Sequence, residues 1–512
     1  MKQILYLLLG CLIPFQFLTA KMYSSPERTP VDYVNPYIGN ISHLLVPTYP
    51  TVHLPNSMLR VYPERENFTG NTINGLPLIV TSHRGSSAFN LSPYQGELQK
   101  AGSIIQYGYD NEVIKPYYYS VDLDDDGMYV QYAPSHQSGI YQIDFSQTDK
   151  PAYLIFNTRN GELKTDGKSI SGYQQLGNHT QVYIYLETDQ QPLKIGTHQG
   201  AVIRTTDKST QGHNAYYILE YPKGTASVLL RYGVSFISSE QAKQNLRREI
   251  KNYNLQAVAD KGRSVWNETL GKIFVKGGTE NEKTVFYTSL YRTYERMICI
   301  SEDGRYFSAY DGQVHDDEGI PFYVDDWIWD TYRATHPLRL IIETEMESNM
   351  VNSLIRMAYQ MQPNWMPTFP EINGDSRRMN CNHGVATVLD AYNKGMRSFD
   401  LAKAYQVCKA AITEKTLAPW SSKPAGVLDQ FYKDHGYFPA LAVGEQETVP
   451  EVHSWERRQP AAVTLGTVYD EWCLGNIAQA LGDKKEADYF LKRSLNYHKI
   501  FNKETCFFHP KD

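Results

Sequence analysis

Cysteine is scarce in this sequence. Six cysteines occur in 512 residues, and no two of them form a CxxC pair. The five that follow Cys11 are widely and irregularly spaced: Cys299, Cys381, Cys408, Cys473 and Cys506. This spacing excludes a disulfide framework or a zinc module as the organising feature of the fold. We expect these side chains to be buried as small apolar groups, and one disulfide stays open.

Basic clusters and long apolar runs are also missing after the first twenty residues. The net charge is −6, and both signs are dispersed along the chain. A protein that binds nucleic acid or an anionic membrane surface usually carries a basic patch, so we expect neither partner. No later stretch reaches the about 18 uninterrupted apolar residues of a spanning helix, so no transmembrane segment is expected.

Residues 1–20 differ from the rest in composition. Lys2 precedes an apolar run from Ile4 to Leu18, and Thr19 and Ala20 then offer small residues for cleavage. These features are typical of a signal peptide. The alternative is a lipobox that ends at Cys11 and makes the protein a lipoprotein. Both interpretations predict an exported protein, in the periplasm or at the cell surface.

Length and tyrosine are what the chain has in abundance. A chain of 512 residues exceeds the roughly 250 to 300 residues at which single cores stop growing, so two or more domains are expected. Tyrosine occurs 39 times. It combines a flat apolar face with a hydroxyl, which suits a carbohydrate-facing surface, although the exposed faces of strands use it as often.

Residues 21–237 predict an antiparallel β-sandwich. Gly, Pro, Asn and Asp separate short segments that alternate in polarity or are rich in β-branched and aromatic residues. The clearest of these segments are Met128–Tyr132, Ile140–Phe145, Tyr153–Phe156, Val182–Leu186, Tyr216–Leu219 and Ser227–Tyr232.

Helical periodicity replaces this pattern in the rest of the chain. Residues 238–280 predict a helical linker, capped by Ser238 or Ser239. Residues 281–512 predict successive helices that pack in antiparallel pairs, with less certain ones near Trp327 and Leu428. The clear ones are Lys283–Met297, Glu343–Met361, His383–Gly395, Asp400–Thr413, Thr464–Leu481 and Lys484–Phe501. The chain is thus an α+β multidomain protein.

The segment Val324–Arg333 holds the side chains that best suit a sugar. An indole can cover the apolar C–H face of a pyranose, and a carboxylate or guanidinium can bridge vicinal hydroxyls. The alternative is a helix start with buried tryptophans and an Asp330–Arg333 pair. Our candidate substrate-binding residues are Trp327, Trp329, Asp330 and Arg333, followed by Asp375 and His383 from loops between helices.

Four motifs occur in order between Val31 and Trp472. They are Val31–Gly39 with Leu54–Met58, then Trp329–Arg333, then His383–Asp400 with its DAYNKG core, and finally Thr464–Trp472. Together these motifs resemble glycoside hydrolase family 92, the calcium-dependent, inverting, exo-acting α-mannosidases. The resemblance implies an N-terminal β-sandwich, a helical linker and an (α/α)6 barrel.

The resemblance also implies a substrate and a mechanism. The substrate would be a mannose-containing glycan that loses its terminal mannose. Inversion needs a carboxylic acid for the leaving oxygen and a carboxylate that activates water, roughly 6.5 to 9.5 Å apart. A calcium ion would bind mannose hydroxyls through a site that needs six to eight oxygen ligands.

One departure from the family lies at the position of its general acid, where this chain has Gly466 in the sequence Thr464-Leu465-Gly466. Asp470 and Glu471, one turn further along the same helix, are our candidate catalytic residues. Glu371 and Glu451 are alternatives on loops. A substrate with a good leaving group, such as a glycosyl phosphate, would need no acid.

A second departure is that family members continue beyond the position of Asp512. We therefore expect an incomplete (α/α)6 barrel that has low activity alone. The catalytic base and most calcium ligands are expected beyond residue 512, and no metal ligand is assigned within the chain. Two other functions stay open: a noncatalytic carbohydrate-binding relative without the general acid, and another hexoside-processing enzyme built on a helical barrel, either a lyase or a phosphorylase.

Overall fold

The structure is a computed structural model that describes residues 28–42, 48–65, 69–81, 87–123, 127–147, 149–177, 179–379 and 382–512. The predicted signal peptide, the lipobox at Cys11 and Cys381 lie outside these residues. No helix in the described part of the chain is both long and apolar enough to cross a membrane.

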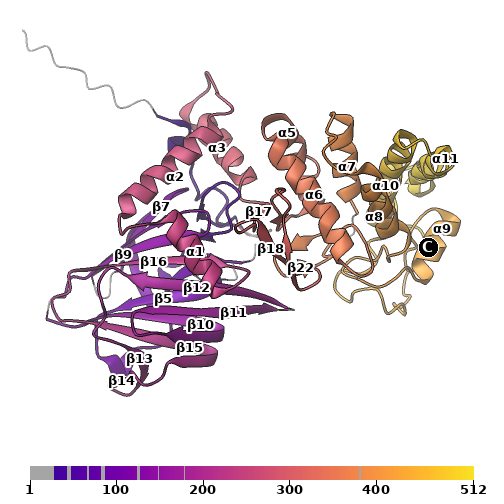
Figure 1. The fold of residues 1–512 in the computed structure, drawn as a ribbon. Coiled ribbons are helices and arrows are strands. Elements are labelled where there is room, and N and C mark those ends of the chain that lie inside the picture. Colours follow the sequence, from indigo (N-terminus) through magenta and orange to yellow (C-terminus); the bar gives the residue numbers. More distant parts are fainter. Residues whose placement is uncertain are drawn as a thin grey trace, which may run out of the picture.

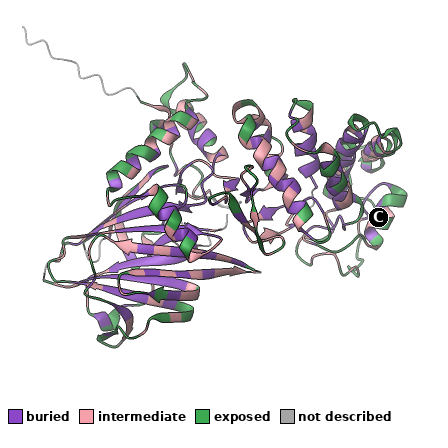
Figure 2. Cartoon of the chain, viewed as in Figure 1, coloured by how far each residue is buried: buried purple, intermediate pink, exposed green. Residues whose placement is uncertain are grey.

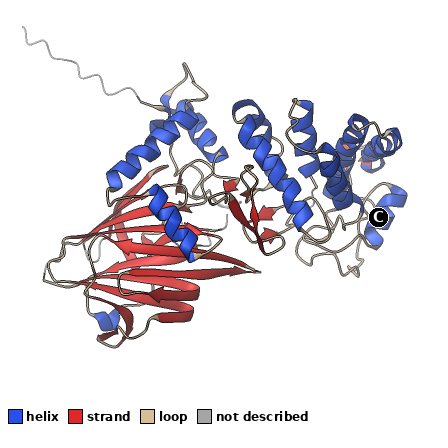
Figure 3. Ribbon diagram, in the orientation of Figure 1, coloured by secondary structure: helices blue, strands red, loops and turns tan. Residues whose placement is uncertain are grey.

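The N-terminal half is built on one large antiparallel sheet (Figures 1 and 3). Fourteen strands of the described residues join in it, with the main order β14-β13-β15-β10-β11-β12-β16-β9-β8-β7-β6-β3; off this order, β5 pairs with β10, and β4 pairs with β5. The strands are β3 (Thr72–Asn74), β4 (Leu76–Val80), β5 (Ser87–Tyr94), β6 (Gln106–Lys115), β7 (Tyr118–Leu123), β8 (Met128–Pro134), β9 (Ser138–Asp144), β10 (Ala152–Thr165), β11 (Ser169–Gly177), β12 (Thr180–Thr188), β13 (Lys194–Gln199), β14 (Val202–Arg204), β15 (Ser209–Tyr221) and β16 (Ser227–Ser235). A short pair, β1 (Val52–His53) and β2 (Arg60–Val61), precedes them.

Strand β10 makes this sheet into a sandwich because it changes partner halfway. Its first half pairs with β5 from Tyr153 to Asn157, and its second half pairs with β11 from Gly161 to Thr165. A strand that switches between sheets is the usual way to form a corner between two layers. Gly161 permits the close crossing, because a Cβ there would lie 1.9 Å from the carbonyl oxygen of Tyr173.

Buried tyrosines link the two layers. The hydroxyl of Tyr141 on β9 donates to the carbonyl oxygen of Pro77 at 2.9 Å, and that of Tyr232 on β16 donates to Leu78 at 2.7 Å. Both acceptors lie on β4, which belongs to the other layer. Each phenol therefore buries its ring in the core and still satisfies its polar end. The predicted sandwich is confirmed.

Three helices follow the sandwich, namely α1 (Ser239–Glu249), α2 (Leu255–Leu270) and α3 (Glu280–Thr293). Ser238 caps α1 by accepting a hydrogen bond from the backbone N–H of Gln241, as the sequence predicted. Helix α1 packs on β16 and β12, and α2 packs on β8. Trp266 of α2 is fully buried, and its indole N–H donates to the His53 carbonyl oxygen at 2.7 Å.

The C-terminal half is helical, and its helices lie side by side in a row (Figure 1). They are α4 (Ile328–Thr331), α5 (Thr335–Ile342), α6 (Thr344–Gln360), α7 (Gly384–Asn393), α8 (Leu401–Thr413), α9 (Val427–His435), α10 (Pro460–Ala480) and α11 (Lys484–Arg493). Short hairpins lie between α3 and α7, formed by β17 (Ile298–Cys299), β18 (Arg305–Ser308), β19 (Gln313–Asp316), β20 (Tyr323–Val324), β21 (Pro370–Glu371) and β22 (Gly374–Asp375). A last hairpin, β23 (Phe501–Asn502) and β24 (Phe507–Phe508), follows α11.

The predicted helices are present, and those near Trp327 and Leu428 are α4 and α9. The helix predicted at Lys484–Phe501 ends at Arg493 and is followed by a 3-10 helix over Ser494–Ile500, and α5 was not predicted. Burial follows their periodicity, since the buried stripes face neighbouring helices while the opposite faces are exposed (Figure 2). Cys408 and Cys473 are buried as predicted, and Cys299 is half-buried. Cys506 is exposed, so the prediction is wrong for Cys506. Cys506 follows the last helix, where little packs over it.

A buried ion pair joins the two halves. Arg60 of β2 donates to the carboxylate of Asp325 at 2.5 Å, and both side chains are 2% exposed. Arg296 lies 3.7 Å from the same carboxylate. Since a buried charge is costly without a partner, this pair fixes the sandwich against the start of the segment 324–333.

We predict that R60M lowers the free energy of unfolding by about 3 kcal/mol, because it leaves a buried carboxylate without its nearest cation. Urea unfolding followed by circular dichroism measures this change. The control is R28M, which breaks the exposed Arg28–Glu280 pair and should leave the midpoint almost unchanged. Equal effects of the two substitutions would contradict the assignment.

Candidate active site

Segment 324–333 begins with two adjacent buried aspartates. Oδ1 of Asp326 accepts hydrogen bonds from the Trp327 backbone N–H at 2.8 Å and from the Thr331 hydroxyl at 2.9 Å. These bonds hold the short helix α4 as a single fixed turn. Asp330 and Arg333 are exposed and Trp329 is half-buried, so three of the predicted substrate residues are accessible to a ligand.

Arg296 connects this turn to its surroundings. Its guanidinium lies 4.0 Å from the centre of the Trp327 ring, and Trp327 stacks on Phe369 at 5.5 Å. Trp327 is therefore enclosed between a cation and an aromatic ring. Trp327 therefore fits the alternative prediction, in which the tryptophan packs at the start of a helix. Trp329 remains available to cover the face of a sugar.

The carboxyl of Asp330 has a shifted pKa although it is accessible. Partial burial raises the pKa of Asp330, and the nearby charge of Arg333 opposes that rise. The Arg333 guanidinium lies 6.0 Å from the Trp329 ring and 5.8 Å from the Tyr332 ring. Cation, carboxylate and indole thus converge on one turn.

Glu371 of β21 is a second carboxyl with a raised pKa. Burial raises it, while Arg378, 3.3 Å away, opposes the rise. Arg296 lowers the pKa values of both Glu371 and Asp330, which places both carboxyls in the field of one guanidinium. The backbone N–H of Asp326 donates to Pro370 at 2.8 Å and ties the Glu371 loop to segment 324–333.

The structure brings His383 and Asp470 together. Nδ1 of His383 lies 2.7 Å from Oδ1 of Asp470, and the other carboxylate oxygen accepts the Asn382 backbone N–H at 3.1 Å. The His383 ring lies 4.3 Å from the ring of Tyr332, which belongs to segment 324–333. His383 therefore borders segment 324–333, while the Asp470 carboxylate is buried and oriented toward His383.

Glu471 lies elsewhere, although it follows Asp470 directly in the sequence. Its carboxylate accepts from Arg493 at 2.6 Å and from the Tyr432 hydroxyl at 3.0 Å, between α9 and α11. Successive side chains on a helix point about 100° apart. Its carboxylate is thus used in helix packing, and we do not retain Glu471 as a catalytic residue.

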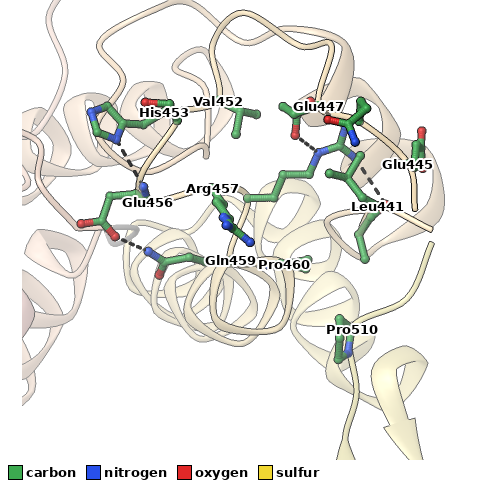
Figure 4. Close-up of a pocket in the computed structure, with 14 residues that line it drawn as sticks. Leu441, Glu445, Glu447, Val452, His453, Glu456, Arg457, Gln459, Pro460 and Pro510 are labelled. Carbon is green, nitrogen blue, oxygen red and sulfur yellow. Dashed lines mark hydrogen bonds and ion pairs between the residues drawn. The ribbon is translucent and has the colours of Figure 1, made fainter. Parts of the chain in front are cut away.

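A cavity of about 730 Å³ lies beside the start of α10 (Figure 4). Its wall includes the loop that carries His453, and Arg458 holds the nearby Glu447 at 2.6 Å. The predicted substrate residues are not among those that line it. Trp420 lies between the loop of His453 and the loop of Glu371, since its ring stacks on His453 at 5.4 Å and lies 5.7 Å from the guanidinium of Arg378.

Comparison with known proteins identifies this architecture. A family model described as the glycosyl hydrolase family 92 N-terminal domain matches residues 33–235, and one described as the catalytic domain of that family matches residues 241–512. The chain belongs to glycosyl hydrolase family 92.

Individual relatives agree with the family. The chain is 22% identical to an uncharacterized secreted glycosidase of Arthroderma benhamiae, and the match covers 98% of the chain and 66% of that protein. It is 25% identical to a solved family GH92 inverting mannosidase of Bacteroides thetaiotaomicron, with a TM-score of 0.83 over 96% of the chain and 67% of the other. A family GH92 α-mannosidase of the same species, solved with mannoimidazole, shares 21% identity and the fold, with a TM-score of 0.82 over 95% and 66%. The chain thus spans about two thirds of the length of these relatives.

Membership of family 92 implies a calcium ion. Among the described residues, no group of three or more His, Cys, Asp or Glu side chains could hold a metal ion. The carboxylates of Asp325 and Asp326 are paired with cations instead. These residues do not fit a calcium site, and no step below is derived through the ion.

Asp375 has a structural position. It is 2% exposed, and its carboxylate accepts the backbone N–H groups of Thr368, Phe369 and Arg377 at 3.0, 2.8 and 3.1 Å. These hydrogen bonds shape the loop that carries Glu371. The sequence predicted a substrate contact at Asp375, whereas the geometry favours a supporting role.

We predict that D375A lowers the free energy of unfolding by roughly 2 to 4 kcal/mol, because three buried N–H groups lose their acceptor. Chemical unfolding measures the loss. D166A is the control, since Asp166 likewise accepts two backbone N–H groups but lies in an exposed turn, where water can replace it. A small effect of D375A would return Asp375 to the list of substrate contacts.

Proposed function

We propose that this chain is the glycoside hydrolase part of an exported protein. That protein releases terminal mannose from the α-mannosides of glycans with inversion of the anomeric configuration. The observation that carries the proposal is the fixed turn of α4, on which Asp330, Arg333 and Trp329 are accessible together. A carboxylate and a guanidinium on one turn can bind adjacent hydroxyls of a sugar, while an indole covers its C–H face.

A general acid is still required at the leaving oxygen, and Gly466 cannot supply a proton. We assign this role to Glu371. Its raised pKa keeps a larger fraction protonated near neutral pH, which is what an acid catalyst needs. Asp470 acts through His383, whose ring it orients from a buried position.

Two features support the cellular side of the proposal. The Arthroderma relative is described as secreted, and the first residues of the chain predict a signal peptide or a lipobox. We therefore propose export to the periplasm or cell surface. We also propose calcium dependence, which rests on family membership alone. Its ligands would lie outside the described residues.

The rival function is carbohydrate binding without catalysis, and Gly466 is the observation that favours it. Turnover separates the two. Hydrolysis of an α-mannoside or a mannosyl phosphate by the 512-residue chain, with β-mannose as the first product in NMR spectra, would support the enzyme. Binding without turnover would support the rival, and a requirement for phosphate or an unsaturated product would indicate a phosphorylase or a lyase.

We predict that D330N weakens mannoimidazole binding by about 10- to 100-fold, because a charge-assisted hydrogen bond contributes about 1.5 to 3 kcal/mol. Isothermal titration calorimetry measures the dissociation constant and needs no catalytic step. D488N is the matched control, because Asp488 is an exposed helical aspartate paired with Lys484. The proposal fails if D330N and the unsubstituted chain bind equally well.

We predict that E371Q lowers kcat for an unactivated mannoside by roughly 10² to 10⁴ and that 4-nitrophenyl mannoside, with its better leaving group, is affected less. An acid works while protonated, so kcat/KM of the unsubstituted chain falls as pH rises through the raised pKa of Glu371. This alkaline limb should vanish in E371Q. E451Q, which changes the other loop glutamate, should keep it; loss of the limb in E451Q instead would move the role to Glu451.

A further inference from the structure

His336 of α5 is a buried imidazole that lies between two carboxylates. Its Nε2 is 2.8 Å from Oδ2 of Asp326, and its Nδ1 is 2.7 Å from Oε1 of Glu347 on α6. The imidazole is 1% exposed, and the two carboxylates are fully buried. None of the steps proposed above uses this group.

The two distances determine how many protons the cluster holds. A neutral imidazole has one N–H and one lone pair, so it could donate to only one carboxylate and would face the other with its lone pair. Two short contacts to carboxylate oxygens therefore require two protons among the three groups. The simplest arrangement is an imidazolium that donates to both acids.

The surrounding charges agree with this count. Asp326 precedes α4, Glu347 comes from α6, and Arg339 comes from α5 and is 2% exposed. Arg339 donates to the Thr293 carbonyl oxygen at 2.7 Å and lowers the pKa of Asp326. Two anions and two cations then balance. Both carboxylates raise the pKa of His336 to about 10, against the effect of burial.

Asp326 links His336 to two parts of the candidate site, the α4 turn and the Glu371 loop. Its other oxygen holds the Trp327 N–H and the Thr331 hydroxyl, which fix the turn that carries Asp330. Its backbone N–H holds Pro370, next to Glu371. A shift of the Asp326 side chain would therefore displace the sugar-binding turn and the proposed acid together.

We propose that His336 is a positioning residue of the candidate site: its doubly paired ring fixes Asp326 between α5 and α6 and thereby sets the geometry of segment 326–333 and of the Glu371 loop. The catalytic part of this inference rests on the proposed function. The local order of segment 326–333 does not depend on it, so the two can be tested separately.

The experiment compares H336Q, H336Q/E347Q and the control H315Q by hydrogen–deuterium exchange and mass spectrometry. H336Q leaves two buried carboxylates without their shared cation. H336Q/E347Q removes one acid together with the imidazole, which restores the charge balance and leaves the amide introduced in place of the imidazole able to donate to Asp326. His315 forms a similar pair with Asp311 at 2.8 Å, in the hairpin of β18 and β19.

We expect peptides that cover residues 326–333 to exchange roughly tenfold faster in H336Q/E347Q, with the rest of the chain and H315Q unchanged. In H336Q/E347Q, mannoimidazole should bind more weakly and kcat/KM should fall roughly a hundredfold, because a displacement of a site residue by about 1 Å has effects of that size. A residue needed only for stability would raise exchange throughout the chain instead.

Three outcomes would overturn the inference: unchanged exchange in 326–333, faster exchange spread evenly over the chain, and a double variant that does not fold, which would make the cluster a requirement of folding. If the unsubstituted chain does not bind mannoimidazole while the local exchange effect is present, the proposed function fails and the positioning role stands.

The charge of His336 also gives a pH signature. Its pKa is near 6.5 when unfolded and about 10 when folded, so its stabilisation is complete below about pH 6.5. It is lost as pH rises toward 10. The difference in melting temperature between the unsubstituted chain and H336Q/E347Q should therefore shrink across that range. A difference that stays constant would contradict a charged His336.

Discussion

Two neighbouring carboxylates, Asp325 and Asp326, form the constraint on which the rest of the structure depends. Asp325 is paired with Arg60 of the sandwich, and Asp326 is paired with His336 of the helical half. Burying four charges is unfavourable by itself, and it is offset only when each charge keeps its partner in good geometry. The segment between the two halves can therefore adopt one arrangement.

This constraint explains why the sandwich belongs to the site although the proposed reacting groups lie on the helical half. Asp325 lies between β20 and α4 and has a positive φ of 68°. Such a backbone is costly for a residue other than glycine and persists only where its surroundings impose it. Arg60 is part of those surroundings, so the sandwich helps to determine where α4 begins.

The acidic residues of the helical half show how environment divides roles among similar groups. Asp470 and Glu471 are consecutive, yet one supports His383 and the other forms a buried pair with Arg493. Burial raises the pKa values of both Glu471 and Glu371. The Glu471 carboxylate is engaged between α9 and α11, whereas Glu371 lies on the loop beside segment 324–333, where a partly buried carboxyl can hold a proton and release it.

Much of the fold could be predicted from the sequence, because burial imposes a period of about two on strands such as β12 and a longer period on helices such as α8. The order of motifs likewise predicted the family. Individual side-chain contacts could not be predicted. Nothing near His336 in the sequence indicates that Glu347 faces its second nitrogen, and the spacing of Asp375 does not show that it accepts three backbone N–H groups. Helical spacing places Asp470 on the face of Gly466 and Glu471 on an adjacent face, but it does not show which segments cover those faces.

Gly466 raises the question of which element carries the general acid. A general acid on a loop can replace one on a helix only if the loop holds it as rigidly. The loop of Glu371 is fixed by hydrogen bonds to the Asp375 carboxylate and by the hydrogen bond between the Asp326 backbone N–H and Pro370. Loss of a glutamate from α10 is therefore compatible with acid catalysis from a different element, provided that these two aspartates stay in place.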